Sequence, residues 1–305
     1  MREREKKRNE RDYEIKERVK EATVEILRKA ETELPADVVR ALERAYEDET
    51  SEIARTQLRA MIENVKLAAK LKRPICQDTG IPIFFVRISA SSSLPLSTLR
   101  LIESGIRDGV EEATTIIPLR GNIVHPFTRL PRGMKESNVG KGVPHIHFII
   151  SEHVEADIEI TVIPKGGGSE NVSTLTILQP FKGEQAFSAL RDLVVESVLN
   201  AGGKPCPPTV IGVGAGGSAD VAMMLAKTAL LRPVGERNTE ENIAASEIEI
   251  LEAVNCTGIG PMGLGGRTTA LDVHIEVADC HITGLPVAIN FQCWAARRAS
   301  ASLKL

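Results

Sequence analysis

Three of the five cysteines lie in loop-like segments, and thiolates are natural ligands for soft metals. Cys76 lies in RPICQDTG, Cys206 in GGKPCPP and Cys293 in INFQCWAARRA. Thiolates that arrive from distant loops suit a metal cluster, because loops converge where helices and strands end. The alternative is that these cysteines are inert, small apolar side chains. No CxxC pair occurs, which excludes zinc ribbons and zinc fingers by spacing.

Glycine-rich segments form a second set of candidates. Two of them match the dinucleotide fingerprint G-x-G-x-x-G, at 212–217 and 258–263. The first follows an expected strand, but no acidic residue ends a second strand about 20 positions later, as a nucleotide site requires. The second follows an expected helix. We therefore expect these segments, and KGGGSEN at 165–171, to bring backbone N–H groups close to an anion, with plain tight turns as the alternative.

The composition is that of a globular protein and excludes several functional classes. The 305 residues are 42% hydrophobic and 26% charged, with a formal net charge of −3. Without a basic excess, and with only seven Phe, two Tyr and one Trp, nucleic acid is not expected as a partner. No run of 18 uncharged apolar residues occurs, and the charged N-terminus has no signal-peptide core. We expect a cytoplasmic protein with reduced thiols and no membrane partner.

The elements that must position these residues form a mixed α/β pattern. Helical periodicity and strand-like apolar runs predict N-terminal helices followed by mixed sheets flanked by helices, without a regular βαβ alternation. Residues 1–13 lack an apolar stripe and are expected to form a frayed, charged arm, with a partner-docking segment as the alternative, ahead of one catalytic domain at 14–305. The expected helices are 14–32, 36–48, 51–71, 96–115, 185–201, 219–231 and 240–255, the expected strands are 81–88, 145–150, 157–163, 208–213, 269–277 and 285–291, and 118–144 is expected to be irregular.

Five motifs in a fixed order carry a family resemblance. They are CQDTG at 76–80, KGGGSEN at 165–171, CPP at 206–208, GIGPMGLGGRTTALDV at 258–273 and CHITGLPVAINFQCWAARRA at 280–299. Together they resemble the class I fumarate hydratases and L-tartrate dehydratases, which are oxygen-sensitive iron–sulfur hydro-lyases. The resemblance runs from about Glu14 to the C-terminus. It fits the α subunit of that family, or equally the N-terminal domain of its single-chain members.

The resemblance implies a site that can be named residue by residue. It implies a [4Fe–4S] cluster that converging loops hold through Cys76, Cys206 and Cys293, with one iron left open for substrate. Gln77, Arg120 and Gly168 match substrate-binding positions, and Asp78 and His281 match positions suited to catalytic proton transfer. The remaining cysteines, Cys256 and Cys280, match no ligand.

The implied activity is that of a hydro-lyase acting on a C4 dicarboxylate. Iron acting as a Lewis acid assists the loss of hydroxide, while arginine and backbone N–H groups stabilise the charge that develops on the carboxylate. Reversible hydration of fumarate to L-malate is the first hypothesis. The alternatives are an L-tartrate dehydratase α subunit, which forms oxaloacetate, and a non-catalytic iron–sulfur scaffold. The chain ends shortly after Cys293, so the catalytic base is expected on a separate β subunit, in an αβ heterodimer or an (αβ)2 assembly.

Overall fold

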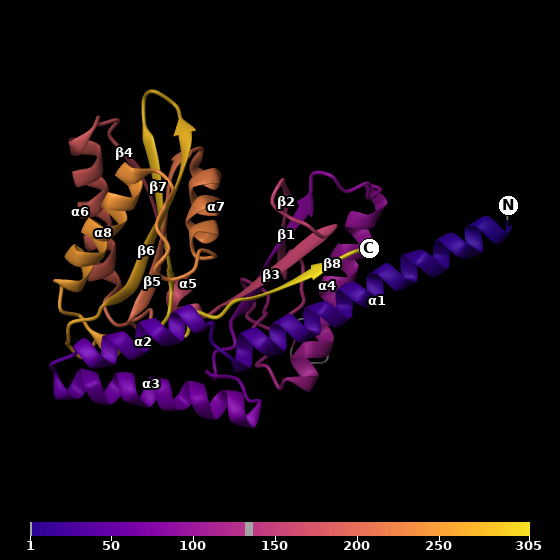
Figure 1. Ribbon diagram of the computed structural model, residues 1–305, viewed down its shortest axis with the longest axis horizontal. Coiled ribbons are helices and arrows are strands. Elements are labelled where there is room, and N and C mark those ends of the chain that lie inside the picture. The colour runs from indigo at the N-terminus through magenta and orange to yellow at the C-terminus, as the bar shows by residue number, and fades with distance from the viewer. Residues whose placement is uncertain (1, 132–136) are drawn as a thin grey trace. The chain divides into compact units, whose positions relative to one another are not determined.

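The structure is a computed structural model that describes residues 2–131 and 137–305 (Figure 1). It contains two four-stranded sheets with flanking helices, which confirms the expected mixed α/β class. The chain forms two compact units, each assembled from separate segments. Unit 1 comprises Met1–Leu34, Ala68–Lys165 and Arg297–Leu305, and unit 2 comprises Pro35–Leu67 and Gly166–Ala296.

Unit 1 consists of one mixed sheet and two long helices. The strand order is β2-β1-β3-β8, in which β1 runs parallel to β2 and antiparallel to β3, and β8 closes the far edge antiparallel to β3. The elements are α1 (Arg2–Thr32), α4 (Ser97–Ile116), β1 (Ile81–Ser89), β2 (His145–Ser151), β3 (Ile158–Lys165) and β8 (Ala299–Leu303).

The core of unit 1 forms where α1 and α4 pack together and on the sheet. Apolar side chains of both helices share one cluster with Phe84 and Val86 of β1. Two glycines of α4 allow the helices to approach closely. A Cβ at Gly105 would lie 2.7 Å from the carbonyl oxygen of Lys16, and a Cβ at Gly109 would lie 2.6 Å from the Cβ of Thr23. The helical spacing of these glycines therefore sets the α1–α4 contact.

Unit 2 contains a sheet of order β4-β7-β5-β6, in which β5 and β6 are parallel and the other pairs are antiparallel. Its strands are β4 (Thr174–Leu178), β5 (Thr209–Gly217), β6 (Ala270–Cys280) and β7 (Leu285–Gln292). Its helices are α2 (Ala36–Asp48), most of α3 (Glu52–Leu71), α5 (Gly167–Glu170), α6 (Glu184–Ala201), α7 (Ala219–Ala229), α8 (Glu241–Asn255) and the 3₁₀ turn η1 (Pro261–Gly263).

The sheet of unit 2 is covered on both faces (Figure 1). Helices α6 and α8 bury Val194, Val198 and Ile250 against one face, in a cluster with Val213 and Ile289 of the sheet. On the other face the small residues of α7, including Ala222 and Ala226, pack against the sheet. This arrangement leaves the loops at the two ends of the strands to carry the candidate site.

Three features differ from the sequence-based expectation. Helix α1 begins at Arg2, so residues 2–13 are helical where a frayed segment was expected; the division into a charged arm at 1–13 and one catalytic domain at 14–305 stays a prediction. Charged helix-favouring residues, including the i,i+4 pair of Lys6 and Glu10 at 3.9 Å, explain a helix without an apolar stripe. The edge strands β4 and β8 were not expected, since TLTIL and ASASL are short and polar in part.

Other expectations hold within the described residues. Those of 118–144 form no helix or named strand, as expected, and the remainder of that segment, 132–136, lies outside the described residues. Among the residues that the structure describes, no helix combines the length and the apolar character needed to cross a membrane.

Candidate functional site

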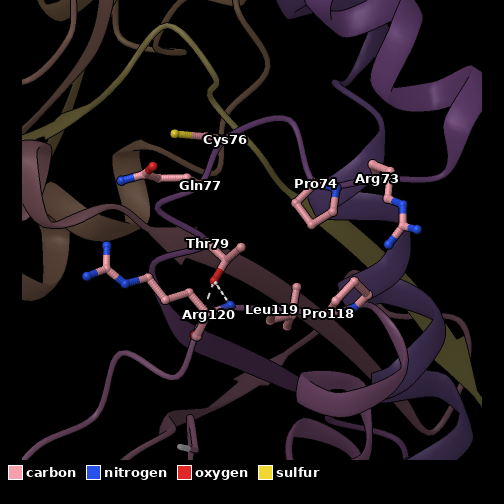
Figure 2. Close-up of a pocket in the computed structure, with 8 residues that line it drawn as sticks. All are labelled: Arg73, Pro74, Cys76, Gln77, Thr79, Pro118, Leu119 and Arg120. Carbon is pink, nitrogen blue, oxygen red and sulfur yellow. Dashed lines mark hydrogen bonds between the residues drawn. The ribbon is translucent and has the colours of Figure 1, made fainter.

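The loop that follows α3 lines a cavity of about 650 Å³ in unit 1 (Figure 2). The lining combines the thiol of Cys76 and the amide of Gln77 with two guanidinium groups. In Figure 2, the guanidinium groups of Arg73 and Arg120 lie on opposite sides of the view, with Cys76 and Gln77 on the side of Arg120. The lining residues are Arg73, Pro74, Cys76, Gln77, Thr79, Pro118, Leu119 and Arg120.

The two sides of this cavity are joined by hydrogen bonds at Thr79, whose side chain is buried. The N–H of Arg120 donates to Thr79 Oγ1 at 3.1 Å, and Thr79 Oγ1 donates to the carbonyl of Arg120 at 3.4 Å. The side chain of Asn122 donates to the carbonyl of Gly80 at 2.9 Å. The segment that carries Arg120 is therefore fixed against the Cys76 loop, 41 positions away in sequence.

The backbone after Cys76 makes a tight turn that requires glycine. Asp78 Oδ1 accepts the N–H of Gly80 at 3.0 Å. Gly80 has a φ of +75°, and a Cβ there would lie 2.6 Å from the backbone carbon of Lys165. Both the left-handed backbone and the close approach to β3 exclude a larger side chain. This turn leaves Asp78 half-buried and Gln77 exposed beside the cavity.

Cys206 and Cys293 lie side by side at one end of the sheet in unit 2. The N–H of Trp294 donates to the carbonyl of Cys206 at 3.0 Å. The antiparallel pairing of β5 with β7, which places Val210 opposite Gln292, brings the two segments together. Both thiols are half-buried, and all five cysteines, which lie in the described part of the chain, are outside disulfides. Cys206 has a φ of +55°, a strained conformation for a residue with a side chain.

Glycine loops surround this end of the sheet. A Cβ at Gly168, at the start of α5, would lie 2.6 Å from the carbonyl oxygen of Lys204, two residues before Cys206. The N–H of Met262, in the second glycine-rich segment, donates to the carbonyl of Pro207 at 2.8 Å. The structure therefore brings Gly168, Cys206 and Cys293 to the same end of unit 2, with the segment at 258–263 against them.

The expectation for the first glycine-rich segment is wrong. Gly212 and Gly214 do not form a loop but lie within β5. A Cβ at Gly212 would lie 2.1 Å from the carbonyl oxygen of Ala226, and one at Gly214 would lie 2.0 Å from that of Ala222. These glycines allow α7 to pack closely on the strand, so their spacing serves helix–sheet packing rather than an anion.

His281 lies away from the paired cysteines. It is exposed in the turn between β6 and β7, where its Nδ1 lies 2.8 Å from Thr283 Oγ1. Cys293 follows the other end of β7, an eight-residue strand that spans about 25 Å. Cys280 lies at the His281 end as well, whereas Cys256 ends α8 and is exposed. The structure does not bring His281 to Cys293 within one chain.

Among the predicted site residues, the structure thus forms two groups. Cys76, Gln77 and Arg120 line the cavity of unit 1, and Asp78 lies in the same loop as Cys76. Cys206, Cys293 and Gly168 lie in unit 2. Arg73 was missed by the sequence reasoning, although it lies three positions before Cys76. The signal was its charge beside the CQDTG motif, but only the cavity shows that it shares a space with Arg120.

A buried carboxylate also lies behind the Cys76 loop. Burial raises the pKa of Glu31 to about 7, although the neighbouring Arg297 guanidinium opposes the shift. Nothing in the motif pattern marks Glu31, because its importance depends on contacts with residues distant in sequence.

Comparisons with known proteins agree on one family. The family model described as fumarate hydratase (Fumerase) matches residues 20–302. A protein of Methanocaldococcus jannaschii named "Putative L(+)-tartrate dehydratase subunit alpha" is 49% identical over 288 residues, which cover 94% of this chain and 98% of the relative. The L(+)-tartrate dehydratase subunit alpha of Escherichia coli K12 is 36% identical over 270 residues, which cover 88% of this chain and 85% of the relative.

Proposed function

The chain belongs to the iron–sulfur hydro-lyase family of the fumarate hydratases and L(+)-tartrate dehydratase α subunits, and on this premise we propose that it is the α subunit of an L(+)-tartrate dehydratase. Its reaction removes water from tartrate and gives oxaloacetate. The names of the relatives favour this alternative over the first hypothesis, fumarate hydration, so the order of the two hypotheses is reversed.

The observation that carries the proposal is the composition of the cavity in unit 1. The residues that line this cavity of about 650 Å³ carry one thiol, one amide and two guanidinium groups, and the volume accommodates a small molecule. Two guanidinium groups suit a substrate with two carboxylates, because each can bind an oxygen pair through parallel N–H donors. A C4 dicarboxylate therefore fits both the charge and the number of donors at this site.

The donor set on the chain fits an iron–sulfur cluster. Cys206 and Cys293 are adjacent, half-buried and outside disulfides, and Cys76 is half-buried at the cavity. Cys76, Cys206 and Cys293 would hold a [4Fe–4S] cluster through their thiolates and leave one iron without a protein ligand. When bound, the cluster supplies a Lewis acid for the substrate hydroxyl.

Residues of this chain would bind the substrate and transfer protons. Arg73 and Arg120 would neutralise the carboxylates and orient the substrate, and Gln77 would donate to a substrate oxygen from the same cavity. The half-buried carboxylate of Asp78 would exchange a proton with the departing oxygen. The backbone N–H of Gly168 would be a further donor to developing negative charge, at the end of unit 2 that carries Cys206.

The proposed role of His281 adds a requirement on the assembly. A cluster held by Cys293 and a substrate beside it span much less than the length of β7. His281 would therefore reach the substrate only from another chain of the assembly. His281 stays a catalytic candidate that acts on the substrate of another chain, because its match to the family motif rests on the sequence and not on the position of the turn.

A partner chain is part of the proposal. The named relatives are α subunits, and the proposal assigns the catalytic base to a β subunit that joins this chain in an αβ or (αβ)2 complex. Fumarate hydration remains the second candidate function, since the matching family model carries that name.

A substrate comparison tests the proposal. The chain and its β partner are reconstituted anaerobically with iron and sulfide, and kcat/KM is measured for L(+)-tartrate, D-tartrate, L-malate and fumarate. The proposal predicts that L(+)-tartrate has the highest value and gives oxaloacetate. A higher value for fumarate or L-malate would assign the chain to fumarate hydratases instead, and no turnover of any of the four would favour the scaffold alternative.

A further inference from the structure

The loop that carries Cys76 is attached at both ends to the two residues of a buried ion pair, at one end through a side chain and at the other through the backbone. Arg297 Nη1 donates to Glu31 Oε2 at 2.6 Å, and both side chains are 1% exposed. The other terminal nitrogen of Arg297, Nη2, donates to the carbonyl of Asp78 at 2.9 Å. At the opposite end of the loop, the N–H of Ile75 donates to the carbonyl of Glu31 at 2.8 Å. Cys76 and Gln77 lie between these two attachment points.

The three parts of this arrangement come from distant parts of unit 1. Glu31 lies in the last turn of α1, the loop follows α3, and Arg297 precedes β8, the edge strand that pairs with β3. The separation between Arg297 and Glu31 is 266 positions. Two long-range elements therefore fix a short loop whose own sequence has no regular structure to hold it.

The geometry of the guanidinium group explains why position 297 needs an arginine. A planar guanidinium presents two nitrogens in a fixed geometry, so one can bind a carboxylate while the other binds a carbonyl. Lysine keeps the charge but cannot hold both acceptors in that geometry. A buried ion pair contributes little net stability, because desolvation offsets the attraction, whereas it does fix the positions of the groups it joins.

We propose that Arg297 and Glu31 are a positioning pair that presets the conformation of the loop from Ile75 to Asp78, so that Cys76 and Gln77 line the cavity before any ligand binds. The geometric part depends only on contacts within unit 1. The consequence for cluster and substrate rests on the proposed function, because it assigns Cys76, Gln77 and Asp78 their roles.

The test measures the loop in the full-length, metal-free chain, without any substrate. Hydrogen exchange of the Ile75 and Gly80 amides and the alkylation rate of Cys76 are compared between wild type and Arg297→Lys. Loss of the bond to Asp78 is expected to accelerate both by about tenfold or more, since a hydrogen bond to a charged donor sets the local opening equilibrium. Exposed Cys256 is the internal reference and keeps its alkylation rate.

Arg232→Lys is the matched control. Arg232 also joins a buried carboxylate, Glu247, to a backbone carbonyl, that of Ile275 at 2.9 Å, but in unit 2. Lysine at this position likewise keeps the charge and loses the fork of donors, and it is expected to leave the exchange of the Cys76 loop unchanged.

A second variant is used if Arg297→Lys does not fold. Glu31→Gln keeps the shape of the pair while it weakens the hydrogen bond that holds Arg297. It is expected to accelerate loop exchange in the same direction.

The proposal would be overturned if the loop of folded Arg297→Lys exchanged and was alkylated at the wild-type rates. If the lysine variant does not fold, the same result in Glu31→Gln would overturn it. Equal acceleration of loop exchange in Arg232→Lys would also overturn it, because it would show general loosening rather than positioning.

A kinetic measurement extends the test to the proposed function. After reconstitution with the β partner, Arg297→Lys is expected to raise KM for L(+)-tartrate at unchanged iron content. Accelerated exchange in a protein whose wild type turns over no tartrate would support the positioning pair and contradict the proposed function, so the two failures are distinguishable.

Discussion

At the scale of single residues, the proposed chemistry depends on which thiols face a shared ligand. Cys76 lines the cavity, and Cys206 and Cys293 are neighbours at one end of unit 2. Cys280 lies at the opposite end of the same sheet, beside Gly217. The positions within unit 2 therefore favour Cys206 and Cys293 over Cys280 as ligands, independently of the family resemblance.

Serine substitutions test this assignment. Cys76→Ser, Cys206→Ser and Cys293→Ser are each expected to prevent a stable cluster, because the remaining thiolates cannot retain it. Cys256→Ser and Cys280→Ser are expected to leave it intact. Iron and sulfide per chain, measured after anaerobic reconstitution, check the result. Loss of the cluster in Cys280→Ser with retention in Cys293→Ser would show that the ligands are wrongly assigned.

His281 gives a second residue-scale prediction. Because its side chain is exposed in a turn, His281→Asn is expected to leave stability and iron content unchanged. Loss of a general acid–base group is expected to lower kcat by about 10²–10⁴-fold, with a smaller change in KM. Turnover is normalised to bound iron for variant and wild type, measured in parallel. Equal normalised rates would remove His281 from the catalytic residues.

Glu31 gives a prediction about pH. Its pKa in the folded chain is raised from 4.5 to about 7 by burial, so the native state holds the proton more tightly than the unfolded chain in that window. The stabilisation that protonated Glu31 contributes is present in full below pH 4.5. It is lost as pH rises through 7, which lowers the free energy of unfolding by roughly 3 kcal/mol. Chemical denaturation of the metal-free chain between pH 4.5 and 8 is expected to show this loss in wild type but not in Glu31→Gln. Parallel pH profiles of the two proteins would contradict it.

At the scale of elements, periodicity predicted most of the fold. The amphipathic spacing at 36–48 gave the bounds of α2, and the apolar runs at 81–88 and 285–291 gave β1 and β7 to within a residue or two. The short edge strands β4 and β8 were missed because an edge strand needs few apolar residues, and its pairing partner is distant in sequence. The glycines of β5 were misread because a tight turn and a close helix contact both select glycine.

The packing of α7 on β5 gives an element-scale prediction. In Gly214→Ala, the added Cβ would lie 2.0 Å from the carbonyl oxygen of Ala222, so α7 must move. Overpacking of this kind is expected to lower the free energy of unfolding by about 1–3 kcal/mol. Gly284→Ala is the control, because its Cβ meets only the exposed side chain of Ile177, at 3.1 Å, and it is expected to cost less than about 0.5 kcal/mol. Equal costs in denaturant titrations would contradict the packing role of Gly214.

At the scale of the whole molecule, the sequence identified the family motifs but not how the chain distributes them. Unit 1 combines the start, the middle and the last residues of the chain, and unit 2 combines two further segments. Arg73 and the Arg297–Glu31 pair could not be found from the motifs, because the first needs the cavity and the second needs contacts across 266 positions. The resemblance implies the chemistry, whereas the proposed positioning groups were found only from the structure.

The most direct test of the central claim is the formation of oxaloacetate from L(+)-tartrate by this chain as an α subunit. Four anaerobic assays are compared after reconstitution with iron and sulfide. They contain the wild-type chain alone, the β partner alone, the wild-type chain with the β partner, and the Cys293→Ser chain with the β partner. The account predicts oxaloacetate only from the wild-type chain combined with the partner. Full activity of the isolated chain, shown by mass spectrometry to contain no partner, or of the partner with the Cys293→Ser chain, would contradict it.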